Sequence, residues 1–193
     1  MKEEKRLIRK RILEIRETAD IGFIHEMSLR ITKKFTSMDI FKKSETIMAY
    51  MDFRNEVATM DLIKFCISHK KRVALPRIES RETGHKEIYP YVIHDILLDT
   101  EPGFYGIMEP VRNPGNLVRP DEIDIVLVPG VAFSEGRYRI GYGAGYYDRF
   151  LKKVRTDCIK IGIAFEFQVL KSIPVEEHDV PLDMIITEER IIL

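Results

Sequence analysis

The sequence predicts a layered α/β fold built around a mainly parallel β-sheet. Segments with strand-like patterns alternate along the chain with segments of helical apolar spacing, and this order is typical of that class. The run IDIVLVPG, residues Ile123–Gly130, is almost uninterrupted in apolar residues, as expected of a parallel strand covered on both faces. With 193 residues and a hydrophobic content of 45%, the chain can bury a sizeable core, and we expect residues 1–193 to form one domain.

The individual elements follow from local patterns. Apolar residues at Ile8, Ile12 and Ile15, with Leu7 alongside, predict a helix over residues 3–17 with one apolar face and basic residues elsewhere. The elements expected after it are helices over 21–34, 59–69 and 145–154, and strands over 46–51, 72–76, 87–93, 123–130 and 158–165, with two short terminal strands within 184–193. We expect Pro76 to end its strand. The Pro- and Gly-containing stretch over residues 100–116 predicts a long irregular loop.

The composition excludes several classes of protein. Lys plus Arg and Asp plus Glu both number 31, so no overall field attracts nucleic acid or an anionic membrane. Residues 1–16 are densely charged and lack the apolar core of a signal peptide, and no later apolar run is long enough to cross a bilayer. We therefore expect a cytoplasmic, monomeric protein that binds neither nucleic acid nor a membrane. Cys66 and Cys158 lie far apart in apolar surroundings, which indicates buried, reduced thiols.

The stretch RYRIGYGAGYYDRFL, residues 137–151, carries the clearest functional signal. Gly141, Gly143 and Gly145 have no β-carbon, so the backbone there can adopt positive φ and present peptide N–H groups to a ligand. The following helix contributes its positive N-terminal end, and Arg139 contributes a full charge. Together these features predict an anion pocket suited to phosphate.

The same stretch also contains groups that attract a cation. Tyr146 and Tyr147 add flat surface that can form hydrogen bonds, and Asp148 is a carboxylate among groups that attract phosphate. Such a carboxylate would repel the ligand unless a cation stood between them, which makes Mg²⁺ a natural partner. The spacing G-x-G-x-G fits neither the dinucleotide fingerprint nor the P-loop. The structural alternative is that the glycines form only a tight turn and that Asp148 favours the first turn of a helix.

Residues 126–151, VLVPGVAFSEGRYRIGYGAGYYDRFL, resemble the signature of the 5-formyltetrahydrofolate cyclo-ligase family, also called 5,10-methenyltetrahydrofolate synthetases. The resemblance extends to KRLIR near the N-terminus, to MDFRNEVAT after the predicted strand that begins at Thr46, and to EEHDVPLD near the C-terminus. These matches occur in the family's order and span nearly the whole chain.

The resemblance implies a fold, an activity and a set of site residues. The fold is a three-layer α/β arrangement like that of ribose-5-phosphate isomerase and CoA transferase-like proteins. The activity is the conversion of 5-formyltetrahydrofolate to 5,10-methenyltetrahydrofolate with hydrolysis of MgATP to ADP and phosphate. The residues implied for ATP are Lys5, Arg9, Arg139, Gly141, Gly143, Gly145, Tyr146 and Tyr147, with Arg139 and Tyr147 in catalytic roles. The residues implied for the folate are Met51, Glu56, Tyr105, Tyr142, Gly143, Ala144, Gly145 and Tyr146, and those implied for Mg²⁺ are Asp148 and Asp179.

Two departures from the family pattern stand out. The family commonly shows F-D-x-x-G-x-R before the glycines, whereas this chain has Ser134 in place of the Asp and its glycine one position earlier, at Gly136. Arg139 still aligns with the arginine of the family pattern, but the pattern does not determine the conformation of the preceding turn in this chain. Some relatives have a tryptophan near the substrate, and this chain has none. Tyr105 falls closest to that position.

Each of the other residues has a structural alternative. Lys5 and Arg9 could belong to a solvated helix face, Glu56 could favour the positive end of a helix beginning near Ala58, and Met51 could be a core residue. We interpret His178 as part of a surface turn and assign it no role. Two other functions remain open: a sugar-phosphate isomerase or CoA transferase-like activity on the same fold, and a nucleic-acid-binding module that uses the basic first helix and exposed tyrosines.

Overall fold

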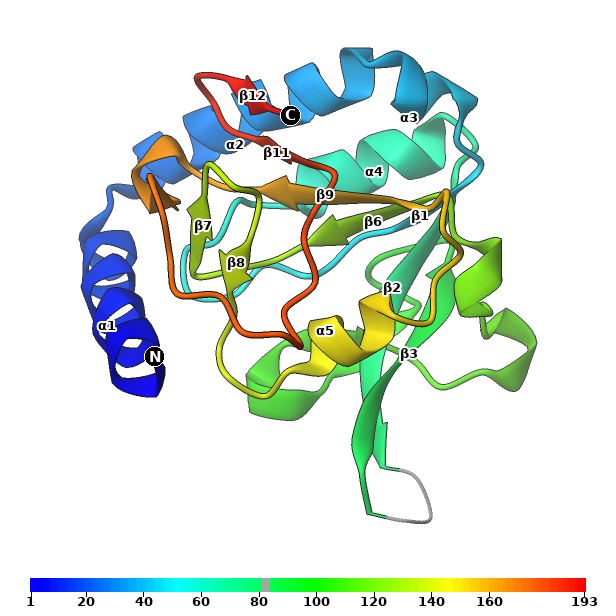
Figure 1. The fold of residues 1–193 in the computed structure, drawn as a ribbon. Coiled ribbons are helices and arrows are strands. Elements are labelled where there is room, and N and C mark those ends of the chain that lie inside the picture. Colours follow the sequence, from blue (N-terminus) through cyan, green and yellow to red (C-terminus); the bar gives the residue numbers. More distant parts are fainter. Residues whose placement is uncertain (81–83) are drawn as a thin grey trace.

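The computed structural model describes residues 1–80 and 84–193, and its main feature is a seven-stranded sheet in the order β12-β11-β9-β6-β1-β2-β3 (Figure 1). Its strands are β1 (Thr46–Met48), β2 (Arg72–Ser80), β3 (Lys86–Ile93), β6 (Ile125–Val128), β9 (Ile159–Ile163), β11 (Met184–Ile186) and β12 (Ile191–Ile192). Neighbouring strands from β11 to β2 are parallel, and the two edge strands, β12 and β3, are antiparallel to their neighbours. The predicted mainly parallel α/β fold is therefore confirmed.

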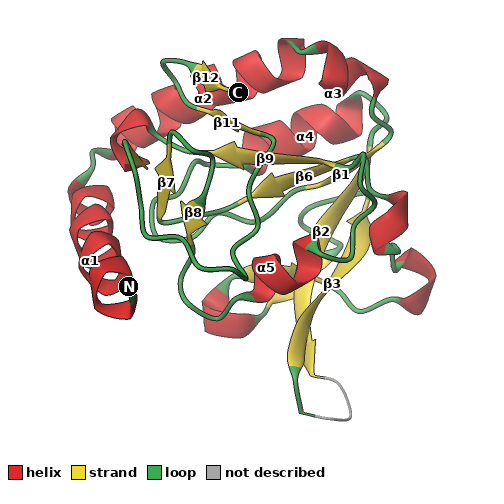
Figure 2. Cartoon of the chain, viewed as in Figure 1, coloured by secondary structure: helices red, strands yellow, loops and turns green. Residues whose placement is uncertain are grey.

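Helices lie on both faces of this sheet (Figure 2). On one face are α2 (Ile21–Ser37), α3 (Asp39–Lys43) and α4 (Met60–Ser68), and on the other is the short α5 (Tyr146–Leu151). A small sheet of β10 (Val169–Leu170), β7 (Ala132–Ser134) and β8 (Arg139–Ile140) adjoins the second face, and α1 (Lys2–Thr18) packs against it. The chain thus forms helix, sheet and helix layers.

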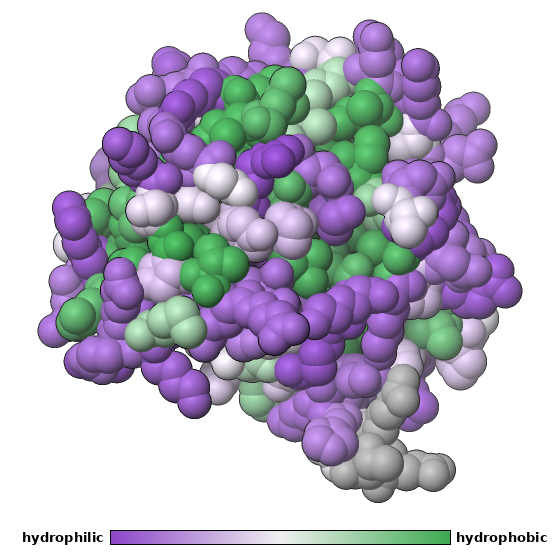
Figure 3. All heavy atoms as spheres, in the orientation of Figure 1, coloured by the Kyte–Doolittle hydropathy of each residue, from purple (hydrophilic) through white to green (hydrophobic). Residues whose placement is uncertain are grey.

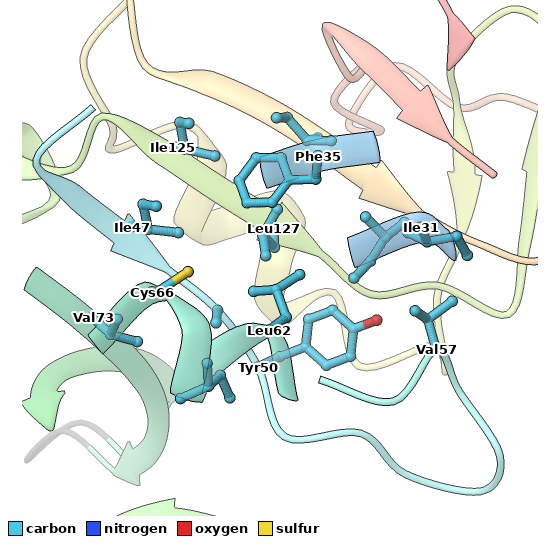
Figure 4. Packing of buried hydrophobic residues seen from close by; sticks show 14 of the residues in the cluster. Ile31, Phe35, Ile47, Tyr50, Val57, Leu62, Cys66, Val73, Ile125 and Leu127 are labelled. Atoms are coloured by element: carbon cyan, nitrogen blue, oxygen red, sulfur yellow. The ribbon is translucent and has the colours of Figure 1, made fainter. Parts of the chain in front are cut away.

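The alternation of side chains along the parallel strands builds a core on each face of the sheet. Ile125 and Leu127 in β6 pack with α2 and α4, as Figure 4 shows, whereas Val126 and Val128 pack with α5 and its neighbours. All four side chains are fully buried or nearly so. The uninterrupted apolar run was therefore a correct signal of a strand covered on both faces.

The predicted end of the strand at Pro76 was wrong. Strand β2 continues to Ser80 and pairs with β3 from Val73 to Ser80, with Pro76 opposite Pro90. Its register with β1 ends at Ala74, and β3 is an edge strand. Neither proline therefore has to donate a ladder hydrogen bond on its outer side, which is the situation in which a sheet tolerates proline.

The first helix forms where it was predicted, and its predicted apolar face is buried in part: Ile12 is in the core and Ile8 packs against it. The buried residues of α1 are Lys5, Ile12 and Arg16, whereas Leu7 is 53% and Ile15 38% exposed. This face is inward because it meets carboxylates and backbone carbonyls that can pair with its cations.

Three other local expectations need correction. Residues 100–116 are not a simple irregular loop, because β4 (Thr100–Pro102) and β5 (Met108–Pro110) form a hairpin there, closed by the 3₁₀ turn η1 (Phe104–Gly106). Helix α5 ends at Leu151 rather than at residue 154, and β1 ends at Met48 rather than at Met51. The two cysteines are free and buried, as predicted, and burial raises the pKa of Cys66 to about 12.

The turn that departs from the family pattern is resolved by the backbone. Between β7 and β8 the residue with positive φ is Arg137, at 63°, and not Gly136. Arg137 stands where the resembled family carries its glycine, so this chain holds an arginine in the left-handed region. Its side chain donates a hydrogen bond to the Asp183 carbonyl at 3.2 Å, and Leu182 N–H donates to its backbone carbonyl at 2.9 Å.

The surface is mostly polar. Hydrophilic residues cover much of the face seen in Figure 3, with apolar patches between them. Among the helices that the structure describes, none is long and apolar enough to span a membrane.

Candidate active site

A cleft of about 700 Å³ is lined by several separate parts of the chain, among them α1, the segment after β1, strands β2, β3 and β8, the β4–β5 hairpin with its turn, the glycine-rich turn before α5, and residues 176–179. All the predicted site residues line it, namely Lys5, Arg9, Met51, Glu56, Tyr105, Arg139, Gly141, Tyr142, Gly143, Ala144, Gly145, Tyr146, Tyr147, Asp148 and Asp179. The fold brings them together from positions that are far apart in sequence.

Lys5 is the most buried of the α1 cations that line the cleft. Its ammonium is buried and lies 2.6 Å from Asp179 Oδ2 and 2.8 Å from Glu176 Oε2. Burial alone would lower the pKa of Lys5, but the hydrogen bonds to Asp179 and Glu176 outweigh it and raise the pKa. The same contact lowers the pKa of Asp179, against the opposing effect of its partial burial. Lys5 is therefore a permanent cation held by two carboxylates.

Arg139 forms a second ion pair in the same cleft. Strand β8 places its guanidinium, which is almost fully buried, 3.0 Å from Asp148 Oδ1, and the Val180 N–H donates to the same oxygen at 3.4 Å. Burial lowers the pKa of Arg139, and the charge of Asp148 opposes this.

The Tyr147 hydroxyl is buried and has no hydrogen-bond partner, alone among the buried side-chain polar atoms of the described residues. Its ring lies beside Arg139, with 6.0 Å between the guanidinium carbon and the ring centroid. Burial raises the pKa of Tyr147 far above its ordinary value, so it stays a neutral hydrogen-bonding group. A buried hydroxyl without a partner in the wall of a cleft is free to bond a ligand.

The glycine-rich turn has the backbone freedom that the sequence predicts at two of its three glycines. Gly143 has φ +109° and Gly145 has φ +66°, both in the region that favours glycine, whereas Gly141 does not lie there. Arg9 Nε donates a hydrogen bond to the Gly141 carbonyl at 2.7 Å, so α1 holds this turn directly. A β-carbon on Gly143 would lie 3.9 Å from an Arg9 nitrogen.

A buried carboxylate forms another part of the cleft wall. Glu56 Oε1 accepts a hydrogen bond from the Tyr142 hydroxyl at 3.2 Å, and Oε2 accepts one from Phe53 N–H at 3.1 Å. The Arg16 guanidinium lies 3.8 Å from Oε1. Burial raises the pKa of Glu56 to about 7, with Arg16, the Phe53 N–H and Tyr142 opposing that rise.

The arrangement of possible metal ligands differs from the predicted pair. Ligand atoms of Glu176, His178 and Asp179 lie within 4.8 Å of one another, so His178, which the sequence analysis assigned no role, lies in the cleft wall. Asp148 lines the same cleft but is engaged by Arg139.

The β4–β5 hairpin contributes aromatic surface to the cleft. Tyr105 is 76% exposed, has φ +58° and packs edge-on against Phe104 at 4.4 Å between ring centroids. Lys86 lies over the Phe104 ring at 4.0 Å. Met51 is half-buried and packs against the core while also lining the cleft.

Sequence reasoning missed four contributors: Arg16, Phe53, Glu176 and His178. A signal for Arg16 was available, because Lys5, Arg9, Ile12 and Arg16 follow one another at spacings of three and four residues and so share one face of a helix. Glu176 and His178 lie beside Asp179 in the quoted EEHDVPLD segment.

These features define an α/β enzyme with a cleft in which paired cations and carboxylates adjoin a glycine-rich turn. Residues 1–188 match the model of the 5-formyltetrahydrofolate cyclo-ligase family, and the chain belongs to this family. It is 29% identical over 188 residues to the 5-formyltetrahydrofolate cyclo-ligase of Haemophilus influenzae, covering 93% of this chain and 95% of that protein. It is 30% identical over 191 residues to the enzyme of the same name from Mycoplasma pneumoniae, covering 96% and 99%.

Solved structures agree with this assignment. The fold is similar to that of the Aquifex aeolicus 5,10-methenyltetrahydrofolate synthetase, with a TM-score of 0.85, 34% identity, and 97% of this chain and 91% of that one covered. It is also similar to the 5,10-methenyltetrahydrofolate synthetase from Mycoplasma pneumoniae, with a TM-score of 0.76, 27% identity, and coverage of 96% and 99%. The resemblance stated from the sequence motifs is thereby confirmed.

Proposed function

We propose that this chain converts 5-formyltetrahydrofolate to 5,10-methenyltetrahydrofolate and consumes MgATP in doing so. The family assignment supports the reaction. The observation that carries the proposal for this chain is that a single cleft contains both a cationic group beside a glycine-rich turn and a buried carboxylate with aromatic neighbours. The first suits a triphosphate, and the second suits a flat ring system that donates hydrogen bonds.

The chemistry requires activation of the formyl group. The formyl oxygen is a poor leaving group, so transfer of the γ-phosphoryl group of ATP to this oxygen releases ADP and leaves the formyl carbon electrophilic. N10 of the folate attacks that carbon, the carbon–oxygen bond breaks with departure of phosphate, and N10 loses its proton. The products are the methenyl compound, ADP and phosphate. The reaction needs no covalent intermediate on the protein.

In this proposal the protein positions the reactants and neutralises charge. Lys5, Arg9 and Arg139 bind the phosphates together with the N–H groups of the glycine-rich turn, and Arg139 stabilises the charge of the transferring group. The Tyr147 hydroxyl, buried without a partner, donates a hydrogen bond to a phosphate oxygen. Lys5 and Arg139 are already paired with Asp179 and Asp148, so phosphate binding exchanges one partner for another.

The carboxylates released by that exchange fit Mg²⁺. Asp148 and Asp179 offer the hard oxygen ligands that this ion prefers, and Glu176 lies within reach of Asp179. When bound, Mg²⁺ would supply neutralising charge for the phosphates. The folate is placed by Glu56, with Met51, Tyr105, Tyr142 and Tyr146 as contact surface.

The test is to mix the purified protein with 5-formyltetrahydrofolate and MgATP and to follow the absorbance of the methenyl product. We expect product only when both substrates are present, with one ADP released per methenyl group formed. A sugar-phosphate isomerase or a CoA transferase would bind phosphate esters without ATP turnover, and that result would overturn the proposal. Light scattering during the same assay tests whether the active form is a monomer.

A further inference from the structure

Arg16 lies behind the wall of the cleft and connects several of its parts. Its side chain has no solvent exposure, and it does not itself line the cleft. Its Nε donates a hydrogen bond to the Arg54 carbonyl at 2.9 Å, and one terminal nitrogen donates to the Phe53 carbonyl at 3.0 Å and to the Arg54 carbonyl at 2.7 Å. That nitrogen also donates to the Tyr142 hydroxyl at 2.6 Å. The other terminal nitrogen contacts the Gly130 carbonyl at 3.4 Å.

These contacts hold a strained segment. Arg54 and Asn55 both have positive φ, at 50° and 56°. Asparagine tolerates this region, but for an arginine it is uncommon and costs free energy unless the surroundings compensate. The Arg16 side chain donates hydrogen bonds to the Phe53 and Arg54 carbonyls. The Asn55 side chain in turn donates a hydrogen bond to the Arg16 carbonyl at 2.9 Å. This segment ends at Glu56, so the position of the Glu56 carboxylate depends on the contacts of Arg16.

The same contacts fix the direction of a proton. A guanidinium only donates hydrogen bonds, so the Tyr142 oxygen accepts from Arg16 and the Tyr142 proton is left to point at Glu56 Oε1. The Phe53 N–H occupies Glu56 Oε2. Each Glu56 oxygen thus accepts one hydrogen bond from the protein, and the remaining lone pairs can take hydrogen bonds from a ligand in the cleft.

We propose that Arg16 is a positioning residue for folate binding: it holds Glu56 and Tyr142 in the orientation that accepts hydrogen bonds from the ring system of the substrate. This inference rests on the proposed function, and it assigns a role to a residue that does not touch the substrate. Several ionisable groups face Glu56, namely Arg16, Tyr142, Asp52, Tyr50 and Tyr147. Of these, Arg16 alone carries a positive charge.

Two substitutions separate the charge of Arg16 from its geometry. Arg16→Lys keeps the charge but cannot reach two carbonyls and the Tyr142 hydroxyl at once, because an ammonium is a point charge without the planar fork. We expect KM for 5-formyltetrahydrofolate to rise roughly tenfold or more, while KM for ATP changes less than about twofold. Arg16→Met removes the charge as well and should shift the acid limb of kcat/KM for the folate to higher pH. Arg11→Met, on the exposed side of the same helix, is the matched control and should leave both constants unchanged.

A double-mutant cycle tests whether Arg16 acts on Glu56 through Tyr142. Arg16→Lys combined with Tyr142→Phe should raise KM for the folate by less than the product of the two single effects, because both act on the same carboxylate. If the effects multiply, or if the Arg16 variants lose only thermal stability and keep both KM values, Arg16 is structural and the proposal is overturned. These variants keep the test decisive even where Arg16→Met does not fold.

A readout that does not use the reaction separates this inference from the proposed function. Carbon-13 NMR titration of Glu56 in the substrate-free protein should show a higher pKa in Arg16→Met than in the wild type. If the wild type forms no methenyl product but this shift is present, the function fails and the Arg16 contact stands. If the wild type is active and the pKa of Glu56 is the same in both proteins, the positioning role fails.

Discussion

The buried cations in the cleft and the buried cation behind its wall are held by different kinds of partner. Lys5 and Arg139 are paired with Asp179, Glu176 and Asp148, all side chains that line the cleft and that a ligand can reach. Arg16, by contrast, is held behind the cleft wall by backbone carbonyls and by Tyr142. In the proposed function the first arrangement exchanges partners with an incoming phosphate and a cation, whereas the second keeps one geometry. We therefore expect one part of the cleft to respond to the charge of a ligand and the other to its shape.

The largest expected effect comes from removing Arg139, one of the two cations that are paired with carboxylates lining the cleft. Arg139→Ala should lower kcat by about 10³-fold, because charge on the transferring phosphoryl group loses its partner. Arg139 is buried against Asp148, so thermal unfolding should also occur at lower temperature. Arg139→Lys, which keeps the charge, is the control for stability. An Arg139→Ala protein that folds and turns over at the wild-type rate would remove Arg139 from the reaction.

The pH dependence of stability tests the part of the cleft wall that contains Glu56. Burial raises the pKa of Glu56 from 4.5 to about 7, so between these values the folded protein binds more protons at this site than the unfolded chain. The stabilisation that this difference in proton binding gives the folded protein is therefore fully present below about pH 4.5. It is lost as the pH rises through 7, and the free energy of unfolding falls by about 3 kcal/mol over that range. Thermal unfolding of the wild type and of Glu56→Gln should be measured from pH 5 to pH 8. As the pH rises, the wild type should lose stability relative to Glu56→Gln, which has no carboxyl group to ionise at this site. Parallel curves would mean that Glu56 titrates normally.

Asp148 and Asp179 should determine the Mg²⁺ concentration that the reaction needs. Asp148→Asn and Asp179→Asn each keep the shape of the side chain but remove a charge, so about tenfold more Mg²⁺ should be needed for the half-maximal rate. The double variant should cost less than the two effects combined if both act through one ion. Mg²⁺ titrations of the initial rate measure this, and calorimetric titration of Mg²⁺ into the protein with ADP provides a readout without turnover. Wild-type magnesium dependence in both single variants would return Asp148 to a structural role.

The glycine-rich turn offers a matched pair of smaller changes. Gly143→Ala places a β-carbon at a residue with φ +109° and should destabilise the fold by about 1 kcal/mol and weaken ATP binding. Gly141→Ala meets no atom within 4 Å and has no such φ, so its stability should match the wild type. Chemical denaturation gives the stabilities, and calorimetry gives the ATP affinities. Equal stabilities would show that the turn relaxes around a side chain.

The smallest effect is expected two residues before Arg139, at Arg137. Arg137→Gly removes the left-handed arginine at φ 63° and should stabilise the fold by up to about 1 kcal/mol, less the contribution of the lost contact with the Asp183 carbonyl. The kinetic constants should stay those of the wild type, because Arg137 does not line the cleft. A change in kcat would mean that the turn between β7 and β8 positions Arg139.

Sequence patterns were sufficient for the elements whose signal is local. The apolar run over Ile125–Val128 identified the central strand, and the glycine motif located the turn before α5. Its prediction of positive φ holds at Gly143 and Gly145 because a backbone that needs that conformation leaves a direct mark in residue type. The motifs also led to the correct family, since the spacing of their residues is preserved in the chain itself.

The orientation of α1 and the partners of its charges were decided only by the tertiary structure. Apolar spacing indicated a face containing Ile8, Ile12 and Ile15. Ile8 and Ile12 do pack inward, but Ile15 is exposed, and the inward face also contains Lys5 and Arg16. The reason is that burying a cation costs free energy unless a partner compensates for it, and the partners lie far away in sequence: Glu176 is 171 residues from Lys5, and the Arg54 carbonyl is 38 residues from Arg16. Periodicity records which residues share a face of a helix, but whether a charged face is buried depends on the distant groups that the fold brings to meet it.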